Sequence, residues 1–366
     1  MNTLAAGRKA APPLLLMAES TPTCLWNDSA TPSELRDAIG WGAVGATCNP
    51  VIALAALRAD LPRWQQRIAD CAAAQPAAGE SAIGWQMIRE LSVEAARLLE
   101  PIFAQHTGRN GRLSIQTDPR LYRDPGAVVE QAVEFSGLAP NIIVKIPAIA
   151  AGIEAIEDVT YRGVSINATV SFTLAQALAV GDAVERGLRR REAEGLDVAT
   201  MGPVCTLMVG RLDDWLKVVV ERESLTLDPG YLEWAGVAVF KKAYAIYRQQ
   251  GFRTRLLSAA FRNHMHWSQL VGGDVVISAP FSWQVRLNKS GIEPVPRIDE
   301  PVNPDIVAEL YAKLTDFRRA YDDNGLSSEE FLRFGATRRT LRQFLSATGE
   351  LECLVRDVLL PDPDSE

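Results

Sequence analysis

Hydrophobic and polar positions form two kinds of segment along this chain. Short apolar runs rich in β-branched residues recur from residue 22 to about 280, and longer segments with helical periodicity separate them. Several runs are too continuously apolar for a half-exposed antiparallel sheet, so they predict parallel strands covered on both faces. Eight strands are predicted: Thr23–Trp26, Ala43–Cys48, Leu113–Thr117, Ile142–Ile146, Val164–Val170, Val204–Val209, Leu256–Phe261 and Val275–Ser278.

The longer segments carry helix-start signals. Asp124-Pro125, for example, places a capping carboxylate before a proline in the first turn. Strands that alternate with helices predict an α/β protein, either a closed (β/α)8 TIM barrel or an open doubly wound sheet. No GxGxxG follows the first strand and no GxxxxGK[ST] occurs, which favours the barrel. The predicted helices include Ser33–Trp41, Asp124–Phe135, Phe172–Arg190 and Leu232–Gln249, with more than one helix in residues 50–111.

The domain organisation that we predict has three parts. Residues 1–21 form an N-terminal arm whose first dozen residues we expect to be loose, residues 22–297 the barrel, and residues 298–366 a helical extension packed on it. A chain of 366 residues could hold two domains, but a barrel of ~250 residues with insertions fits equally well. The helices predicted in the extension are Asn303–Arg319, Ser327–Leu345 and Leu351–Leu359.

Composition narrows the function classes. A net charge of −7 argues against nucleic acid as a partner. Five irregularly spaced cysteines without a CxxC pair indicate reduced thiols, so we expect a cytoplasmic protein. The apolar run Leu14–Met17 is too short for a signal segment and no other stretch could span a bilayer, so no membrane contact is expected.

The carboxyl ends of the strands are where an α/β barrel places its active site. Lys145 stands out there, because it is charged within the apolar run Ile142–Pro147. It must face the barrel interior or lose its hydration, and desolvation would leave a neutral amine able to attack a carbonyl. The alternative is a structural lysine, either paired with a buried carboxylate or reaching water at the strand end.

Several motifs resemble those of the transaldolase family. Gly45–Pro50 resembles G-V-T-S/T-N-P, and Ile143–Ala148 with the following Gly152 resembles I-K-I-P-A-T-x-x-G. Leu113–Arg120 is similar to V-S-x-E-V-D-P-R, and Ile166–Phe172 to I-N-x-T-L-x-F. The segments occur in the family's order across the whole predicted barrel, and this ordered set is far more specific than any one motif.

The resemblance implies roles for catalytic residues. Lys145 matches the lysine that forms a Schiff base, and Asp28 matches the carboxylate that takes the proton from the C4 hydroxyl during cleavage. Thr169 matches a residue that positions the catalytic water, and Gln116 stands at the position of the acid/base glutamate. Outside the family, an aspartate like Asp28 before Ser29–Pro32 could equally be a turn or helix-cap residue.

Substrate-binding roles are implied as well. Asn49 and Asn167 match side chains that hydrogen-bond sugar hydroxyls, and Thr206 keeps the hydroxyl of a family serine. Arg211 and Arg262 match the arginines that bind phosphate, an anion that guanidinium groups suit well. Isolated residues of these types more often form turns or surface ion pairs, so the family match carries these assignments.

Three departures from the family pattern bear on activity. Gln116 replaces a titratable glutamate, as in the related fructose-6-phosphate aldolases, but Met208 stands where those aldolases have a tyrosine. Ala260 stands where many transaldolases have a serine that contacts phosphate. His264 and His266 are too few for a metal site, although one of them could be the missing proton carrier.

The resemblance implies an enzyme that transfers a dihydroxyacetone unit between phosphorylated ketose and aldose sugars, as in the pentose phosphate pathway. It needs neither a metal nor an organic cofactor. One alternative is an aldolase-like enzyme of specialised metabolism that acts on a non-standard sugar. Another is a sugar-phosphate-binding protein with little catalysis. The sequence does not determine the oligomeric state, and a homodimer is compatible with it.

Overall fold

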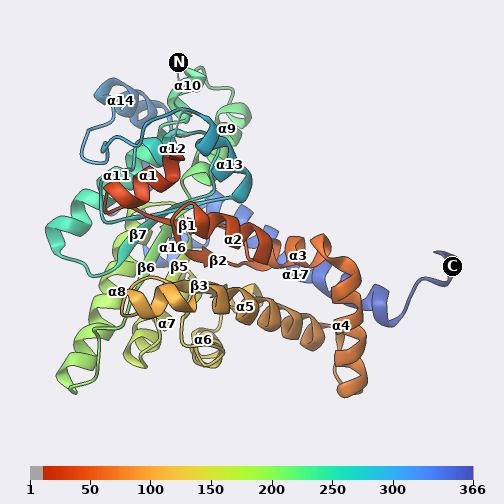
Figure 1. Ribbon diagram of the computed structural model, residues 1–366. Helices are drawn as coiled ribbons and strands as arrows, with labels where there is room; N and C mark the ends of the chain where they lie inside the picture. The colour runs from red at the N-terminus through yellow and green to blue at the C-terminus, as the bar shows by residue number, and fades with distance from the viewer. Residues whose placement is uncertain (1–10, 366) are drawn as a thin grey trace, which may run out of the picture.

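A closed barrel of eight parallel strands in chain order forms the centre of the protein in this computed structural model, which describes residues 11–365 (Figure 1). This confirms the predicted (β/α)8 barrel, and each predicted strand end lies within two residues of the observed one. The strands are β1 (Cys24–Asn27), β2 (Ala43–Thr47), β3 (Arg112–Gln116), β4 (Ile142–Pro147), β5 (Ile166–Ser171), β6 (Val204–Leu207), β7 (Arg255–Ala259) and β8 (Val276–Ala279).

Helices cover the outside of the barrel. The structure has three helices in the long insert between β2 and β3, where the sequence predicted more than one: α3 (Pro50–Ala59), α4 (Leu61–Ala74) and α5 (Glu80–Gln105). The other helices between strands are α2 (Pro32–Gly40), η1 (Pro119–Leu121), α6 (Pro125–Ser136), α7 (Ala150–Tyr161), α8 (Leu174–Ala193), α9 (Val209–Arg222), α10 (Pro229–Leu232), α11 (Ala235–Gln250), α12 (Met265–Ser268) and α13 (Phe281–Lys289), which follows β8. None of the helices within residues 11–365 combines the length and apolar character that crossing a bilayer requires.

The strands are buried on both faces. Their inward-facing and outward-facing side chains belong to two different apolar clusters. Every residue of β3 to β8 is buried. A small apolar cluster, which includes Trp26, Ile143 and Leu257, fills the inside of the barrel. A much larger cluster, which includes Val144 and Ile146, lies between strands and helices. Because side chains alternate along a strand, this division fixes which residues face inward.

The N-terminal arm contains a helix that packs on the barrel. Residues 1–10 of the expected loose arm lie outside the described residues, but Pro13–Ser20 forms helix α1. Leu14 and Met17 of this helix are fully buried, and the Met17 sulfur accepts a hydrogen bond from the Trp267 indole at 3.0 Å. This part of the arm is therefore packed on the barrel.

The C-terminal extension is helical, but the predicted division into helices is wrong. It consists of α14 (Pro304–Lys313), α15 (Thr315–Tyr321), α16 (Ser328–Phe331), α17 (Gly335–Leu359) and the short η2 (Pro363–Ser365). Helix α17 runs unbroken through Gly349, where two separate helices were predicted, because Ala347 and Leu351 on either side are buried. Burial of one face outweighs the weak helix propensity of a single glycine.

Helix α17 lies across the carboxyl ends of the barrel strands. It packs on α3, α4 and α5, which project to one side of the barrel (Figure 1), and it also contacts η1, β5 and α9. The elements α3, η1 and α9 begin just after β2, β3 and β6. The extension therefore belongs to the face of the barrel where the sequence places the candidate site.

Candidate active site

A row of polar side chains crosses the barrel at Lys145. Ile143 belongs to the inner apolar cluster, so Lys145, two residues further along β4, also faces the inside. In the register of the sheet, Lys145 lies opposite Gln116 of β3 on one side and Asn167 of β5 on the other. Alternation on three neighbouring strands thus brings these predicted site residues together.

Lys145 is a buried amine without a fixed partner. Only 2% of it is exposed, and burial holds its pKa below the ordinary value of 10.5. Asp28 and Cys48 raise this pKa, whereas Arg211 lowers it. Within residues 11–365, the amine of Lys145 forms no hydrogen bond and no ion pair. Lys145 is therefore not the structural lysine paired with a buried carboxylate that we considered as an alternative. The result is a desolvated nucleophile close to a carboxylate.

Asp28 follows β1 at the same end of the barrel. Its backbone N–H donates to the Ala279 carbonyl at 3.1 Å, and one carboxylate oxygen accepts a hydrogen bond from the Thr47 hydroxyl. The alternative role as a helix cap is not observed, because α2 begins after Thr31 and Asp28 caps nothing. Its negative charge raises the pKa values of both Lys145 and Arg211, so the carboxylate acts on both groups.

Gln116 and Thr169 have polar atoms left for a bound molecule. Gln116 is 2% exposed, and neither its amide oxygen nor its amide nitrogen has a hydrogen-bond partner among residues 11–365. The Thr169 hydroxyl has only the Met208 sulfur, at 4.0 Å. A buried amide without partners costs ~1–3 kcal/mol per group, so both side chains suit a polar group of a ligand beside Lys145.

Asn167 and Thr206 are bound mainly to each other. The Thr206 hydroxyl donates to the Asn167 side-chain oxygen at 2.7 Å, and the Asn167 amide donates to the Ser114 hydroxyl at 3.1 Å. The side-chain oxygen of Asn49 caps α3 by accepting from Val51 and Ile52. The turn-forming role considered for Asn49 is therefore real, and it leaves only the amide nitrogen for a ligand.

Arg211 and Arg262 form a cationic pair beside the lysine. Burial, with a contribution from Arg262, lowers the pKa of Arg211 to about 10. Arg262 is partly engaged in an ion pair, because its Nε lies 2.8 Å from an Asp214 carboxylate oxygen. Two guanidinium groups close enough to repel each other favour an anion between them.

Helix α17 contributes residues to this site that the sequence did not indicate. Arg211 donates to the Gln343 side-chain oxygen at 2.6 Å and to the Thr340 hydroxyl at 3.2 Å. The exposed Arg339 adds a further positive charge that lowers the pKa of Arg211. No motif marks these residues, because only the path of the extension across the barrel brings them to Arg211.

His266 is not the missing proton carrier. It is fully buried, its Nε2 lies 2.8 Å from the Asp213 carboxylate, and its Nδ1 accepts from the Arg262 backbone N–H at 3.0 Å. The Asp213 carboxylate also accepts from the Gly236 backbone N–H, and burial raises its pKa. With both ring nitrogens engaged, His266 holds the Arg262 loop against α9.

The histidines also do not assemble a metal site. Within residues 11–365, no three His, Cys, Asp or Glu side chains lie where they could share a metal ion. His264 is held by the Ser268 hydroxyl at 3.0 Å.

The fold and the site together define the class. This is a (β/α)8-barrel protein whose strands present a buried lysine and unpaired polar groups at their carboxyl ends, next to two arginines. Residues 25–330 match the family model described as Transaldolase/Fructose-6-phosphate aldolase. The chain belongs to this family, as its motifs predicted, and is an enzyme of the transaldolase/aldolase type.

Curated relatives agree with this assignment. A transaldolase of Thiobacillus denitrificans is 29% identical over 333 residues, which cover 81% of this chain and 88% of the relative. Transaldolase 1 of Streptomyces avermitilis is 36% identical over 173 residues, or 46% of this chain and 45% of the relative. Transaldolase 2 of Streptomyces coelicolor is 32% identical over 209 residues, which cover 56% of this chain and 55% of the relative. The matches to the Streptomyces proteins span about half of those chains.

The buried contact between His266 and Asp213 gives a testable prediction. His266→Ala leaves a buried carboxylate and the Arg262 N–H unpaired, and should lower the free energy of unfolding by about 3 kcal/mol. Urea unfolding followed by circular dichroism measures this loss. His264→Ala, which removes only a partly buried contact to a hydroxyl, is the control and should cost much less. Equal losses in both variants would contradict the role given to His266.

Proposed function

We propose that this protein is a transaldolase-type enzyme that transfers a dihydroxyacetone unit from a phosphorylated ketose to an aldose. The observation that carries the proposal is Lys145, a desolvated, unpaired amine that faces the barrel interior beside Asp28 and Arg211. Membership of the family supports it, and so do the transaldolases among the relatives. Sugar metabolism of the pentose phosphate type and a cytoplasmic location fit this reaction and the five free cysteines.

The proposed reaction begins at Lys145. The neutral amine adds to C2 of the ketose, and loss of water gives an iminium. Asp28 then takes the proton of the C4 hydroxyl, the C3–C4 bond breaks, and its electrons move into the iminium to form a neutral enamine. The shortened aldose phosphate leaves, and an acceptor aldehyde reacts with the enamine in the reverse sequence.

Gln116 restricts how protons move in this scheme. Its amide can hold a water molecule but cannot titrate, so loss of water from the carbinolamine needs another acid. Burial raises the pKa of the neighbouring Cys48 thiol to about 12, which makes it a poor proton carrier. Asp28 is then the carboxylate that serves both steps: it takes up the proton released when the amine adds to the carbonyl, gives it to the leaving hydroxyl as water forms, and is ionised again before it accepts the C4 hydroxyl proton.

Two residues support a second candidate reaction. Met208 is the neighbour of the Thr169 hydroxyl, and Gln116 beside Lys145 has unpaired amide atoms, so the groups that would handle the water differ from those of the family pattern. This favours an aldolase-like reaction on a non-standard sugar over a pure binding protein. A binding protein would gain nothing from burying an uncompensated lysine.

Borohydride trapping tests the proposal directly. After incubation with fructose 6-phosphate and reduction, we expect a mass increase of one reduced dihydroxyacetone unit on the Lys145 peptide. Addition of erythrose 4-phosphate before reduction should discharge the adduct. Lys145→Met, confirmed as folded, is the control and should show no adduct. Absence of an adduct on the folded native chain would rule out the standard transaldolase reaction and favour the non-standard sugar.

The pH dependence of trapping follows from the lowered pKa of Lys145. Below this pKa the amine is protonated and has no lone pair, so the trapping rate should rise with pH. It should reach its plateau well below pH 10.5, the ordinary pKa of a lysine. Initial rates of adduct formation across pH measure this profile. A rate that keeps rising to pH 10.5 would contradict the desolvated amine.

Arg262→Gln tests the proposed phosphate contact. Removal of one charged hydrogen-bond donor should raise KM for the phosphorylated ketose by roughly 10- to 100-fold with little change in kcat. Trapping with unphosphorylated dihydroxyacetone is the internal control, and its rate should not change. An equal loss with both substrates would mean that Arg262 acts on the fold or on Lys145 instead of the phosphate.

A further inference from the structure

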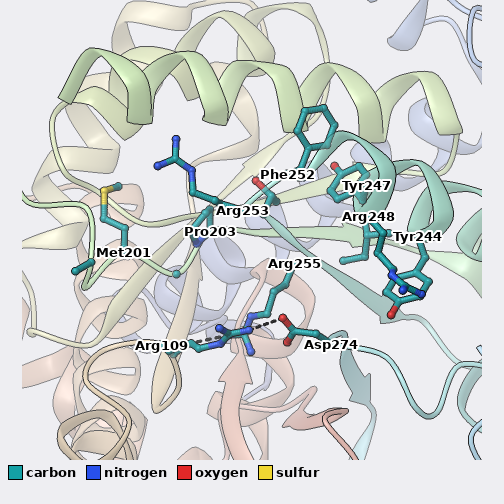
Figure 2. Close-up of a pocket in the computed structure, with 15 residues that line it drawn as sticks. Arg109, Met201, Pro203, Tyr244, Tyr247, Arg248, Phe252, Arg253, Arg255 and Asp274 are labelled. Carbon is teal, nitrogen blue, oxygen red and sulfur yellow. Dashed lines mark hydrogen bonds and ion pairs between the residues drawn. The ribbon is translucent and has the colours of Figure 1, made fainter. Parts of the chain in front are cut away.

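A cavity of about 500 Å³ opens at the amino-terminal end of the barrel (Figure 2). Its walls come from the loops before β3, β6, β7 and β8 and from helix α11. We call it the floor cavity. The residues that matter for its chemistry are Arg109, Met201, Tyr244, Phe252, Thr254 and Arg255.

The floor cavity is separate from the site at Lys145. Arg255 begins β7 and faces inward, because Leu257, two residues further along, belongs to the inner apolar cluster. Trp26, Ile143 and Leu257 of that cluster lie between the ends of the barrel. The barrel interior is thus charged at its floor, apolar in the middle and polar at Lys145.

Two buried guanidinium groups at this floor form no ion pair with the carboxylates of residues 11–365. Arg255 is 6% exposed and donates to the Asn110 side-chain oxygen at 3.1 Å and to the Arg109 carbonyl at 2.9 Å. Arg112 is 4% exposed and donates only to backbone carbonyls, at 2.6–3.3 Å. No carboxylate within residues 11–365 forms an ion pair with either residue. Burial lowers the pKa of both arginines. The pKa of Arg112 falls to about 10, and repulsion from the positive charge of Arg255 contributes to this decrease.

The carboxylates around the cavity are engaged by other arginines. Asp274 pairs with Arg109 across the opening (Figure 2), and Arg253 pairs with Glu185 and Glu192. Asp274 raises the pKa of Arg255, but its ion pair is with Arg109, so within the described residues neither buried guanidinium has an ion-pair partner of its own. Thr254 of the cavity wall is 3% exposed, and its hydroxyl has no hydrogen-bond partner in the part of the chain that the structure describes.

We propose that the floor cavity binds a small organic dianion, a phosphate monoester or a dicarboxylate, beside Arg255 and Thr254. The anionic group supplies an ion-pair partner and accepts the free Thr254 hydroxyl, while Met201 and Phe252 line the cavity for the organic part. The ligand is an effector or stabiliser and not a substrate, because the apolar layer separates it from Lys145. Arginines that only tie loops together would not need an open cavity beside them.

Calorimetric titration of the full chain tests this site. The probes are inorganic phosphate, malonate and phenyl phosphate, and the background variant Arg262→Gln weakens anion binding at the opposite end. We expect one saturable site, with phenyl phosphate tighter than inorganic phosphate because its ring contacts the apolar wall. Arg255→Gln and Thr254→Val should each weaken binding, by at least tenfold for the arginine. The control Arg222→Gln, on the exposed surface of α9, should bind as the background does.

A second variant tests the same cavity independently, in case Arg255→Gln does not fold. Ala199, an exposed residue of the cavity wall, is not a hydrogen-bond partner of Arg255, although the carbonyl of the next residue, Thr200, accepts from Arg112. Ala199→Trp should therefore block the cavity, abolish binding and leave thermal unfolding unchanged. No heat with any of the three probes on folded protein would overturn the proposal. Binding that survives in both Ala199→Trp and Thr254→Val would place the anion elsewhere and overturn it equally.

Discussion

The two-residue alternation of side chains on closed parallel strands is the constraint on which this structure depends. Once Ile143 joins the apolar cluster inside the barrel, Lys145 has no direction available except inward. The same rule turns Gln116 and Asn167 toward it from the neighbouring strands. A charged amine is thereby buried without a partner, which lowers its pKa and prepares it to attack a carbonyl.

The carboxyl end of the barrel holds its shape through strained backbone and close packing. Val170 and Ala260, at the ends of β5 and β7, have positive φ angles of 54° and 64°, which side chains with a Cβ rarely adopt. Gly210 lies so close to the Ala260 carbonyl that a Cβ would come within 2.0 Å of it. Together with the buried pair of His266 and Asp213, these contacts fix Arg211 and Arg262 relative to each other. Strain of this kind persists only where the surrounding packing determines the geometry.

The C-terminal extension ties the outer helices to the site. Helix α17 crosses the ends of the strands, and its residues Thr340 and Gln343 hold the Arg211 side chain. The same helix packs on α3, whose first turn is capped by Asn49. Changes in the extension can therefore alter the shape of the site without touching Lys145.

The sequence by itself determined the barrel, its strands and the residues at the strand ends, because short apolar runs are a local signal and the motifs have a fixed order. Lys145 was recognisable as a charge in an apolar strand for the same reason. The partners of Arg211 in α17, the contact of His266 with Asp213, and the buried Arg112 and Arg255 came only from the tertiary structure. These features join segments that lie tens to hundreds of residues apart along the chain, or depend on carboxylates engaged elsewhere. A local sequence pattern carries no information about such long-range contacts or about which carboxylates are already engaged, because packing decides which distant side chains meet.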